Sequence, residues 1–151
     1  MGYILYAFVS KEENLLPIQN AYSHAKLVKL EQGISLIPVT GELYDQINEF
    51  TISEDINGFV YLTTNVETQI LKAIGNQSIA YVEAEYFGGN GGQKAIIWKD
   101  NKRLSVFPDS QNAINKVLQI LGVTPDKRKD EFDTVGLGRY RDMEEWVEVS
   151  K

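Results

Sequence analysis

The chain of 151 residues has no cysteine and one histidine, His24. Without cysteine it can form no disulfide, thiolate zinc site, iron–sulfur cluster or cysteine nucleophile. The segment "SHA" around His24 matches no metal-ligand spacing, and a catalytic histidine needs an oriented partner, so we interpret His24 as a surface or packing residue. Neither a Ser–His–Asp order nor a G-x-S-x-G motif occurs. The sequence therefore identifies no catalytic residue, cofactor or metal site.

Basic residues and long apolar runs are also scarce. Lysine and arginine total 15 against 21 aspartates and glutamates, which gives a net charge of −6. A nucleic-acid binder would carry a basic stripe, so nucleic acid is disfavoured as a partner, whereas the acidic charge favours a basic protein partner. No apolar run approaches the ~20 residues that span a bilayer, and the N-terminal segment lacks the basic region and cleavage site of a secretory signal. We expect a cytoplasmic protein that does not bind membranes.

The composition and the hydrophobic periodicity predict one α+β domain over residues 1–151. Hydrophobic residues make up 43% of the chain and charged residues 24%, close to the globular average. Short apolar runs predict strands at residues 3–9, 34–39, 59–62, 79–86, 94–99 and 104–107. Helical spacing predicts about four helices, at residues 20–31, 41–50, 64–74 and 111–121. This order of elements predicts a mixed or antiparallel sheet.

The sequence also predicts where three of the helices begin and how the C-terminal segment packs. Thr40 precedes a helix in which Leu43, Ile47 and Phe50 share one face. Thr64 and Glu67 match a capping box, and either Asp109 or Ser110 is placed to cap the helix at 111–121. Residues 126–151 form a polar tail, but they carry several aromatic residues, so we expect the tail to pack on the domain.

A glycine cluster lies in "YVEAEYFGGNGGQKAIIW", residues 81–98. Gln93 separates the last glycine from Lys94 and a strand follows, so a Walker A loop is excluded. The dinucleotide pattern G-x-G-x-x-G also fails, because counting from Gly89 places Lys94 at its last position. We interpret "GGNGG" as a five-residue hairpin connection. Its unshielded backbone, at residues 88–93, is a candidate contact surface for a ligand or partner through Gly89, Asn90, Gly91 and Gln93.

Two glutamates, Glu83 and Glu85, precede the glycines and share one face of the predicted strand. Residues at positions i and i+2 of a strand lie roughly 7 Å apart, because the rise is ~3.3 Å per residue. Such a pair can bind a hard metal ion or work as an acid and a base. Alternatively, the glutamates form ordinary cross-strand pairs with Lys94, Lys99 or Arg103.

The tail segment "DEFDTVGLGRYRDMEEW" contains Arg139 and Arg141 among many acidic residues. Arginine side chains at this spacing can bind a carboxylate or a phosphate. Alternatively, they form internal ion pairs that dock the tail, for example onto Glu83 or Glu85.

The segments "EAEYFGGNGGQKAIIW" and "DEFDTVGLGRYRDMEEW" together resemble small uncharacterised bacterial proteins that carry a similar acidic strand, glycine-rich loop and Gly-Leu-Gly-Arg tail. The similar segments cover about half of the chain. The resemblance implies no activity and no catalytic residue. It implies that the two segments act together.

Three kinds of function fit these observations. A non-enzymatic protein-binding module fits the acidic charge and the missing catalytic motifs, and an immunity-like or antitoxin-like role against a basic nuclease is one version of it. The alternative is a small enzyme or metal-binding protein that uses Glu83 and Glu85. A third possibility is a homo-oligomer with Trp98, Trp146 or the tail at its interface. The sequence favours the binding module and leaves the oligomeric state open.

Overall fold

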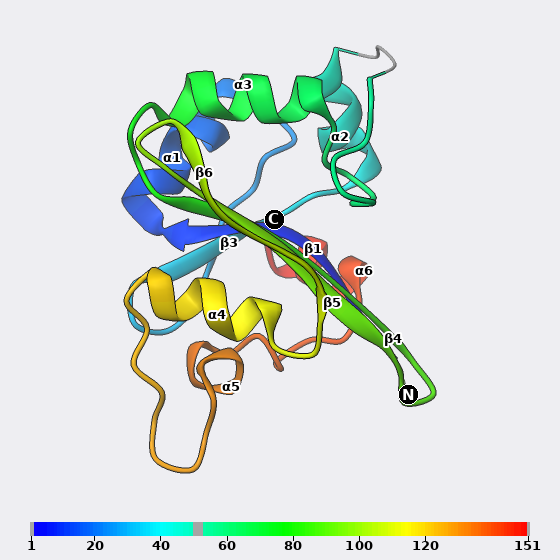
Figure 1. Ribbon diagram of the computed structural model, residues 1–151, viewed down its shortest axis with the longest axis vertical. Coiled ribbons are helices and arrows are strands. Elements are labelled where there is room, and N and C mark those ends of the chain that lie inside the picture. The colour runs from blue at the N-terminus through cyan, green and yellow to red at the C-terminus, as the bar shows by residue number, and fades with distance from the viewer. Residues whose placement is uncertain (1, 50–52, 151) are drawn as a thin grey trace.

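The computed structural model describes residues 2–49 and 53–150 and shows an α+β single domain with one antiparallel sheet, as the sequence predicts (Figure 1). The sheet has six strands in the order β2-β3-β1-β4-β5-β6. The strands are β1 (Tyr3–Lys11), β2 (Val28–Lys29), β3 (Ile34–Pro38), β4 (Ile79–Phe87), β5 (Asn90–Lys99) and β6 (Lys102–Ser110). The helices are α1 (Glu12–Ala21), α2 (Gly41–Asn48), α3 (Thr64–Ile74), α4 (Ala113–Ile120), α5 (Glu131–Val135) and α6 (Met143–Ser150).

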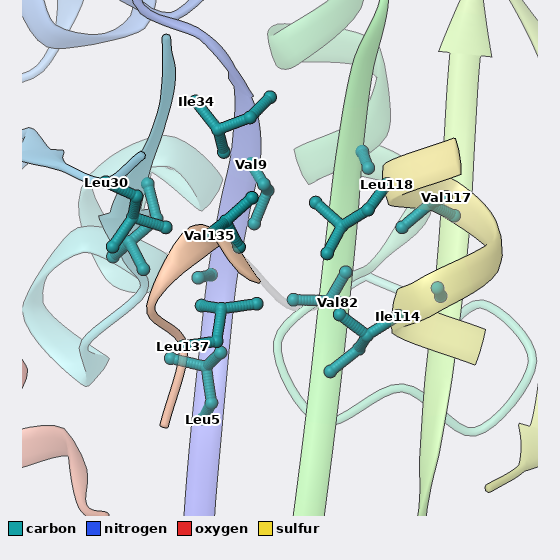
Figure 2. Close-up of a cluster of buried hydrophobic side chains, with 14 of the residues drawn as sticks. Leu5, Val9, Leu30, Ile34, Val82, Ile114, Val117, Leu118, Val135 and Leu137 are labelled. Atoms are coloured by element: carbon teal, nitrogen blue, oxygen red, sulfur yellow. The ribbon is translucent and has the colours of Figure 1, made fainter. Parts of the chain in front are cut away.

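Helices cover both faces of the sheet, and each face has its own core. One face of β1, β4 and β5 packs against α1, α2 and α3, and the other face packs against α4 and the segment that contains α5 (Figure 1). Figure 2 shows the second core, where Val82 of β4 meets Ile114 and Leu118 of α4, and Leu5 of β1 lies near Leu137 of the tail. Because side chains alternate along a strand, the two cores take alternate residues of the central strands.

The hairpin between β4 and β5 is confirmed, but its connection is shorter than five residues. Phe87 pairs with Asn90, so the turn is only Gly88 and Gly89, whose φ angles are 57° and 84°. Two consecutive positive φ angles are typical of the type I′ turn that matches strand twist. Gly91 already belongs to β5, where its φ is 148° and an added Cβ would lie 1.9 Å from the carbonyl oxygen of Glu85. Gly91 therefore serves a close backbone approach within the sheet.

The helix predicted at residues 20–31 is wrong. The helix lies one segment earlier, as α1, and includes Pro17. Leu15 and Ile18 of α1 are fully buried, whereas Val28 lies in β2 and pairs with Leu36. Burial of α1 on the sheet and strand pairing by residues 28–29 outweigh the helical spacing of the intervening residues.

The strand predicted at residues 59–62 is also wrong. This segment is an irregular loop, whose nearest pairing is an isolated bridge between Asp55 and Thr63. The apolar residues that suggested a strand are explained by burial, because Phe59 and Leu62 belong to the core. The amides of Val60 and Tyr61 in this loop donate hydrogen bonds to the Glu83 side chain instead of to a neighbouring strand.

Two of the predicted helix starts need correction, while a third is confirmed. Thr40 caps α2 by accepting a hydrogen bond from the Leu43 amide at 3.1 Å, as expected. Thr63, one residue before the predicted position, caps α3 through the Val66 amide, and the expected capping box of Thr64 and Glu67 does not form. The residue before α4 is Asn112, because β6 runs on to Ser110.

Other features of these helices follow the sequence more closely. Leu43 and Ile47 are buried as expected, and Phe50 lies outside the described residues. Val66, Ile70 and Ile74 form the buried face of α3. The described helices number six rather than about four, chiefly because α5 and α6 form within the polar tail. None of the helices in the described ranges is long and apolar enough to cross a membrane.

The tail lies beside the first half of β1, beyond the end of β3. The Ile4 amide donates to the carbonyl oxygen of Arg141 at 2.8 Å, and the Tyr6 amide donates to the Met143 sulfur at 3.3 Å. The tail thus satisfies donors that β3 is too short to reach. Trp146 of α6 and Trp98 of β5 are both fully buried, so neither supplies the exposed oligomer interface considered above.

Candidate functional site

Glu83 lies in the middle of β4 with its carboxylate buried on the face that packs against α1–α3. Only 3% of the residue is exposed. Its Oε2 accepts three hydrogen bonds, from the Val60 amide at 2.7 Å, the Tyr61 amide at 3.1 Å and the Tyr81 hydroxyl at 2.5 Å. The irregular loop at residues 59–62 therefore wraps this carboxylate. A strand at that position could not turn two successive amide groups towards one oxygen, because amides alternate in direction along a strand.

Burial and hydrogen bonding act in opposite directions on Glu83. Desolvation raises the pKa of the Glu83 carboxyl, and the bonds from Tyr81, Tyr61 and Val60 offset only part of that rise. Tyr81 is fully buried, and desolvation together with the neighbouring carboxylate raises its pKa well above the usual value. Tyr81 therefore stays a hydrogen-bond donor at any physiological pH.

Glu83 borders a polar pocket of about 240 Å³, which we call the acidic pocket. It is lined by Glu83, Glu85, Gly91, Gly92, Lys94 and Asp109. The strand register explains the grouping, because Glu83 faces Lys94 across the β4–β5 pair and Glu85 faces Gly92. Asp109 reaches the same place from β6, where its Oδ1 would lie 2.8 Å from a Cβ added to Gly92. Glycine at position 92 thus leaves the room that Asp109 occupies.

Charge in the acidic pocket is unbalanced. Three carboxylates line it against one ammonium group, that of Lys94. The Lys94 ammonium donates to the carbonyl oxygen of Gly58 at 3.1 Å, and its charge lowers the pKa of Glu83 less than the hydrogen bonds do. The expected pairing of Glu83 with Lys94 is thus found in the register. Of the other two expected partners, Arg103 binds Glu67, and Lys99 lies opposite Lys102 in the register.

A group of tyrosines adjoins the acidic pocket on the same face of the sheet. Tyr6 of β1 lies opposite Glu83 in the register, and its ring meets that of Tyr61 edge-on at 5.2 Å. Tyr61 in turn packs on Tyr44 of α2 at 5.1 Å. Desolvation raises the pKa of Tyr6, with further contributions from the charge of Glu85 and a hydrogen bond to it. Tyr6 therefore stays neutral at physiological pH and connects the tyrosine group to the acidic pocket.

Tyr6 and Tyr61 also line a second, larger cavity of about 470 Å³, which we call the tyrosine pocket. Its other walls come from the end of β3, the start of α2 and one side of α6. The sequence did not predict this cavity. Its lining residues are dispersed from position 6 to position 148, and tyrosines in a strand read as ordinary core residues.

The other residues selected from the sequence lie apart from the acidic pocket. Gln93 accepts a hydrogen bond from the Ile114 amide, at the α4 side of the sheet. Gly89 and Asn90 are exposed at the hairpin tip. Arg139 forms an ion pair with Glu31 and does not dock the tail onto Glu83 or Glu85. The backbone of Arg141 bonds to Ile4 and to the Glu145 side chain.

Metal binding gains no support from these groups. Within residues 2–49 and 53–150, no group of three histidine, aspartate or glutamate side chains is placed to hold a metal ion. The pair Glu83 and Glu85 therefore lacks a suitably placed third ligand among those residues.

Comparison with known proteins adds no relative to this description. No family model matches the chain, and neither the curated proteins nor the solved structures include a significant match.

Proposed function

We propose that the protein is a binding module that receives a positively charged side chain of a basic partner protein in the acidic pocket. The observation that carries the proposal is the convergence of Glu83, Glu85 and Asp109 on one pocket that holds a single lysine. The pocket, at about 240 Å³, is smaller than the ~300–1,000 Å³ typical of drug-sized ligands. Its size suits the end of a lysine or arginine side chain.

The arrangement of the three carboxylates supports this function. Glu83 is held by its three donors. Asp109 is exposed and Glu85 is half-buried, so both are accessible to an incoming group. The net charge of −6 would attract a basic protein at long range, and the pocket would then fix the register of the complex. A basic nuclease, as in immunity or antitoxin systems, is one partner of this kind.

A titration with basic peptides tests the proposal. Hexaarginine and hexalysine are added to the ¹⁵N-labelled protein at low salt, with hexaglutamate as the reference of opposite charge. We expect saturable shifts of the amides of residues 83–94 with the basic peptides alone. Shifts spread evenly over the whole surface would contradict a specific pocket.

Two charge-reversal variants distinguish binding in the acidic pocket from attraction by the net charge of the whole protein. Asp109→Lys changes the pocket, and Asp126→Lys changes the net charge equally at an exposed site outside its lining. We expect Asp109→Lys to weaken peptide binding by about tenfold, and Asp126→Lys by about twofold, because exposed charge pairs contribute ~0.2–1 kcal/mol and a reversal adds repulsion. Equal effects of the two variants would reject the pocket as the binding site.

Catalysis by the carboxylate pair is the second candidate function, and the raised pKa of buried Glu83 favours it. A desolvated carboxyl group can keep its proton and act as a general acid beside a second carboxyl group such as that of Glu85. A panel of chromogenic glycosides and esters tests this function. Turnover that disappears in both Glu83→Gln and Glu85→Gln would support it, and absence of turnover across the panel would count against it.

A further inference from the structure

The tyrosine pocket lies between elements that are far apart in the sequence. Tyr6 of β1 and Tyr61 of the irregular loop line it together with Met143 and Val147 of α6. Val39, directly after β3, adds a further apolar group. The volume of about 470 Å³ lies in the range that holds a small ligand. Apolar and aromatic walls of this kind bind the hydrocarbon or aryl part of a ligand.

The aromatic walls also attract positive charge. Tyr6 and Tyr61 are packed edge to face, and Tyr44 supports Tyr61 from behind, so the rings are held in place. A cation within ~6 Å of a tyrosine ring is attracted by the negative face of the ring, and the attraction is strongest for neutral rings with little water around them.

The charged side chains around the pocket have one sign. They are the glutamates Glu42, Glu144 and Glu148. The part of the chain that the structure describes contributes no lysine or arginine to the lining. The start of α2 adds partial positive charge near Gly41, equivalent to roughly half a unit. The carboxylates of Glu42 and Glu144 alone outweigh that half unit, so an anionic ligand is disfavoured and a cation is favoured.

We propose that the tyrosine pocket binds an organic cation with an apolar body, such as an arylalkyl ammonium ion. The apolar body lies against Tyr6, Met143 and Val147, and the ammonium group faces the rim formed by Glu42 and Glu144. This site is separate from the acidic pocket, and it does not depend on the proposed protein partner.

The test uses three probes of similar shape and different charge. Phenethylammonium, 2-phenylethanol and 3-phenylpropanoate are titrated separately into the ¹⁵N-labelled protein. We expect phenethylammonium to shift the amides of Tyr6, Tyr61 and Met143 in a saturable manner. The neutral alcohol should bind about tenfold more weakly, because it lacks both the cation–π and the carboxylate attraction. The carboxylate should not bind.

Matched variants locate the site. The double variant Glu42→Gln/Glu144→Gln keeps the shape of the rim and should lower the affinity for phenethylammonium about fivefold. Glu145→Gln removes the same charge from the same helix outside the pocket lining, and Asp109→Asn removes a charge from the acidic pocket. Both controls should bind like the wild type. No saturable response to phenethylammonium, equal binding of the alcohol, or an unchanged affinity in the double variant would each overturn the proposal.

Discussion

The hydroxyl of Tyr81 donates a 2.5 Å hydrogen bond to the buried carboxylate of Glu83, two residues further along the same strand. Both side chains point to the face that α1–α3 cover, so the donor and acceptor meet away from water. The pair matters for the acidic pocket because Glu83 is the pocket's only buried carboxylate among the described lining residues.

Removing this donor should lower stability and raise the pKa of Glu83. Tyr81→Phe keeps the ring contacts with Phe8 and Phe59 but deletes a bond to a charged acceptor, which we expect to cost about 1.5–3 kcal/mol at neutral pH. The bond lowers the pKa of Glu83 in the wild type, so its loss raises that pKa further. Urea unfolding gives the free energy, and a carboxyl ¹³C titration gives the pKa.

The control for Tyr81→Phe is Tyr86→Phe on the same strand. The Tyr86 hydroxyl bonds to Gln111 at an exposed site, so its loss should cost less than about 1 kcal/mol. The cost of Tyr81→Phe should shrink in acid, where Glu83 becomes protonated. A cost that is independent of pH would contradict the assigned partner.

The glycines of the hairpin should differ sharply in their tolerance of substitution. A Cβ at Gly91 would collide with the Glu85 carbonyl oxygen at 1.9 Å, so Gly91→Ala must shift the backbone of β4 or β5. We expect a loss of more than about 1 kcal/mol of unfolding free energy. Gly88 has a φ of 57° and nothing within 4 Å of an added Cβ. Because asparagine tolerates this conformation, Gly88→Asn should change stability by less than about 0.5 kcal/mol. Thermal unfolding of the two variants provides the comparison, and similar losses would contradict the hairpin geometry.

The pair Glu67 and Arg103 should contribute stability that depends on pH. Arg103 donates to both carboxylate oxygens at 2.7 and 2.8 Å, and the ring N–H of buried Trp98 donates to one of them at 2.8 Å. Burial alone would raise the pKa of Glu67, but these bonds outweigh burial and lower it. A lowered pKa in the folded state means that the ionised carboxylate stabilises the fold.

Replacing Glu67 tests that contribution. Glu67→Met should lower the unfolding free energy by about 1–3 kcal/mol at neutral pH, chiefly because Trp98 loses its acceptor. The difference from the wild type should be complete above the ordinary glutamate pKa of about 4.5 and diminish as the pH falls through the lowered pKa. Arg103→Gln keeps the Trp98 bond and should cost less than about 1 kcal/mol, since Arg103 is partly exposed. Urea unfolding from pH 3 to 7 measures both variants, and a difference that grows in acid would contradict the assigned direction.

Local patterns predicted those parts of the fold that depend on neighbours in sequence. Alternating residues at 79–86 and the Gly-Asn run predicted the β4–β5 hairpin, and Thr40 predicted the start of α2. The prediction failed at residues 20–31 and 59–62, where apolar residues are buried without forming the expected element. Burial of an apolar side chain constrains its position in the core, but it does not fix the backbone conformation that brings it there.

The candidate site was predictable only in part. Placing Glu83 and Glu85 on one face of a strand follows from the two-residue period, and their approach to Lys94 follows from hairpin pairing. Asp109 was considered only as a helix cap, because nothing in the sequence shows that β6 continues past Pro108. One of the two interpretations placed Arg139 in an internal ion pair, for example with Glu83 or Glu85, and its actual pairing with Glu31 depends on the path of the whole tail.

The sequence by itself determined an acidic α+β domain with a glycine-tipped hairpin and two glutamates on one strand face. Composition, periodicity and turn residues act over a few positions, so they can be read along the chain. Tertiary structure alone decided that Glu83 is buried and that Tyr6 lies against Met143. The two backbone donors to Glu83 stand 22 and 23 residues away, and Met143 stands 137 residues from Tyr6. Such contacts are set by the packing of the helices and the tail against the sheet, and no local pattern encodes that packing.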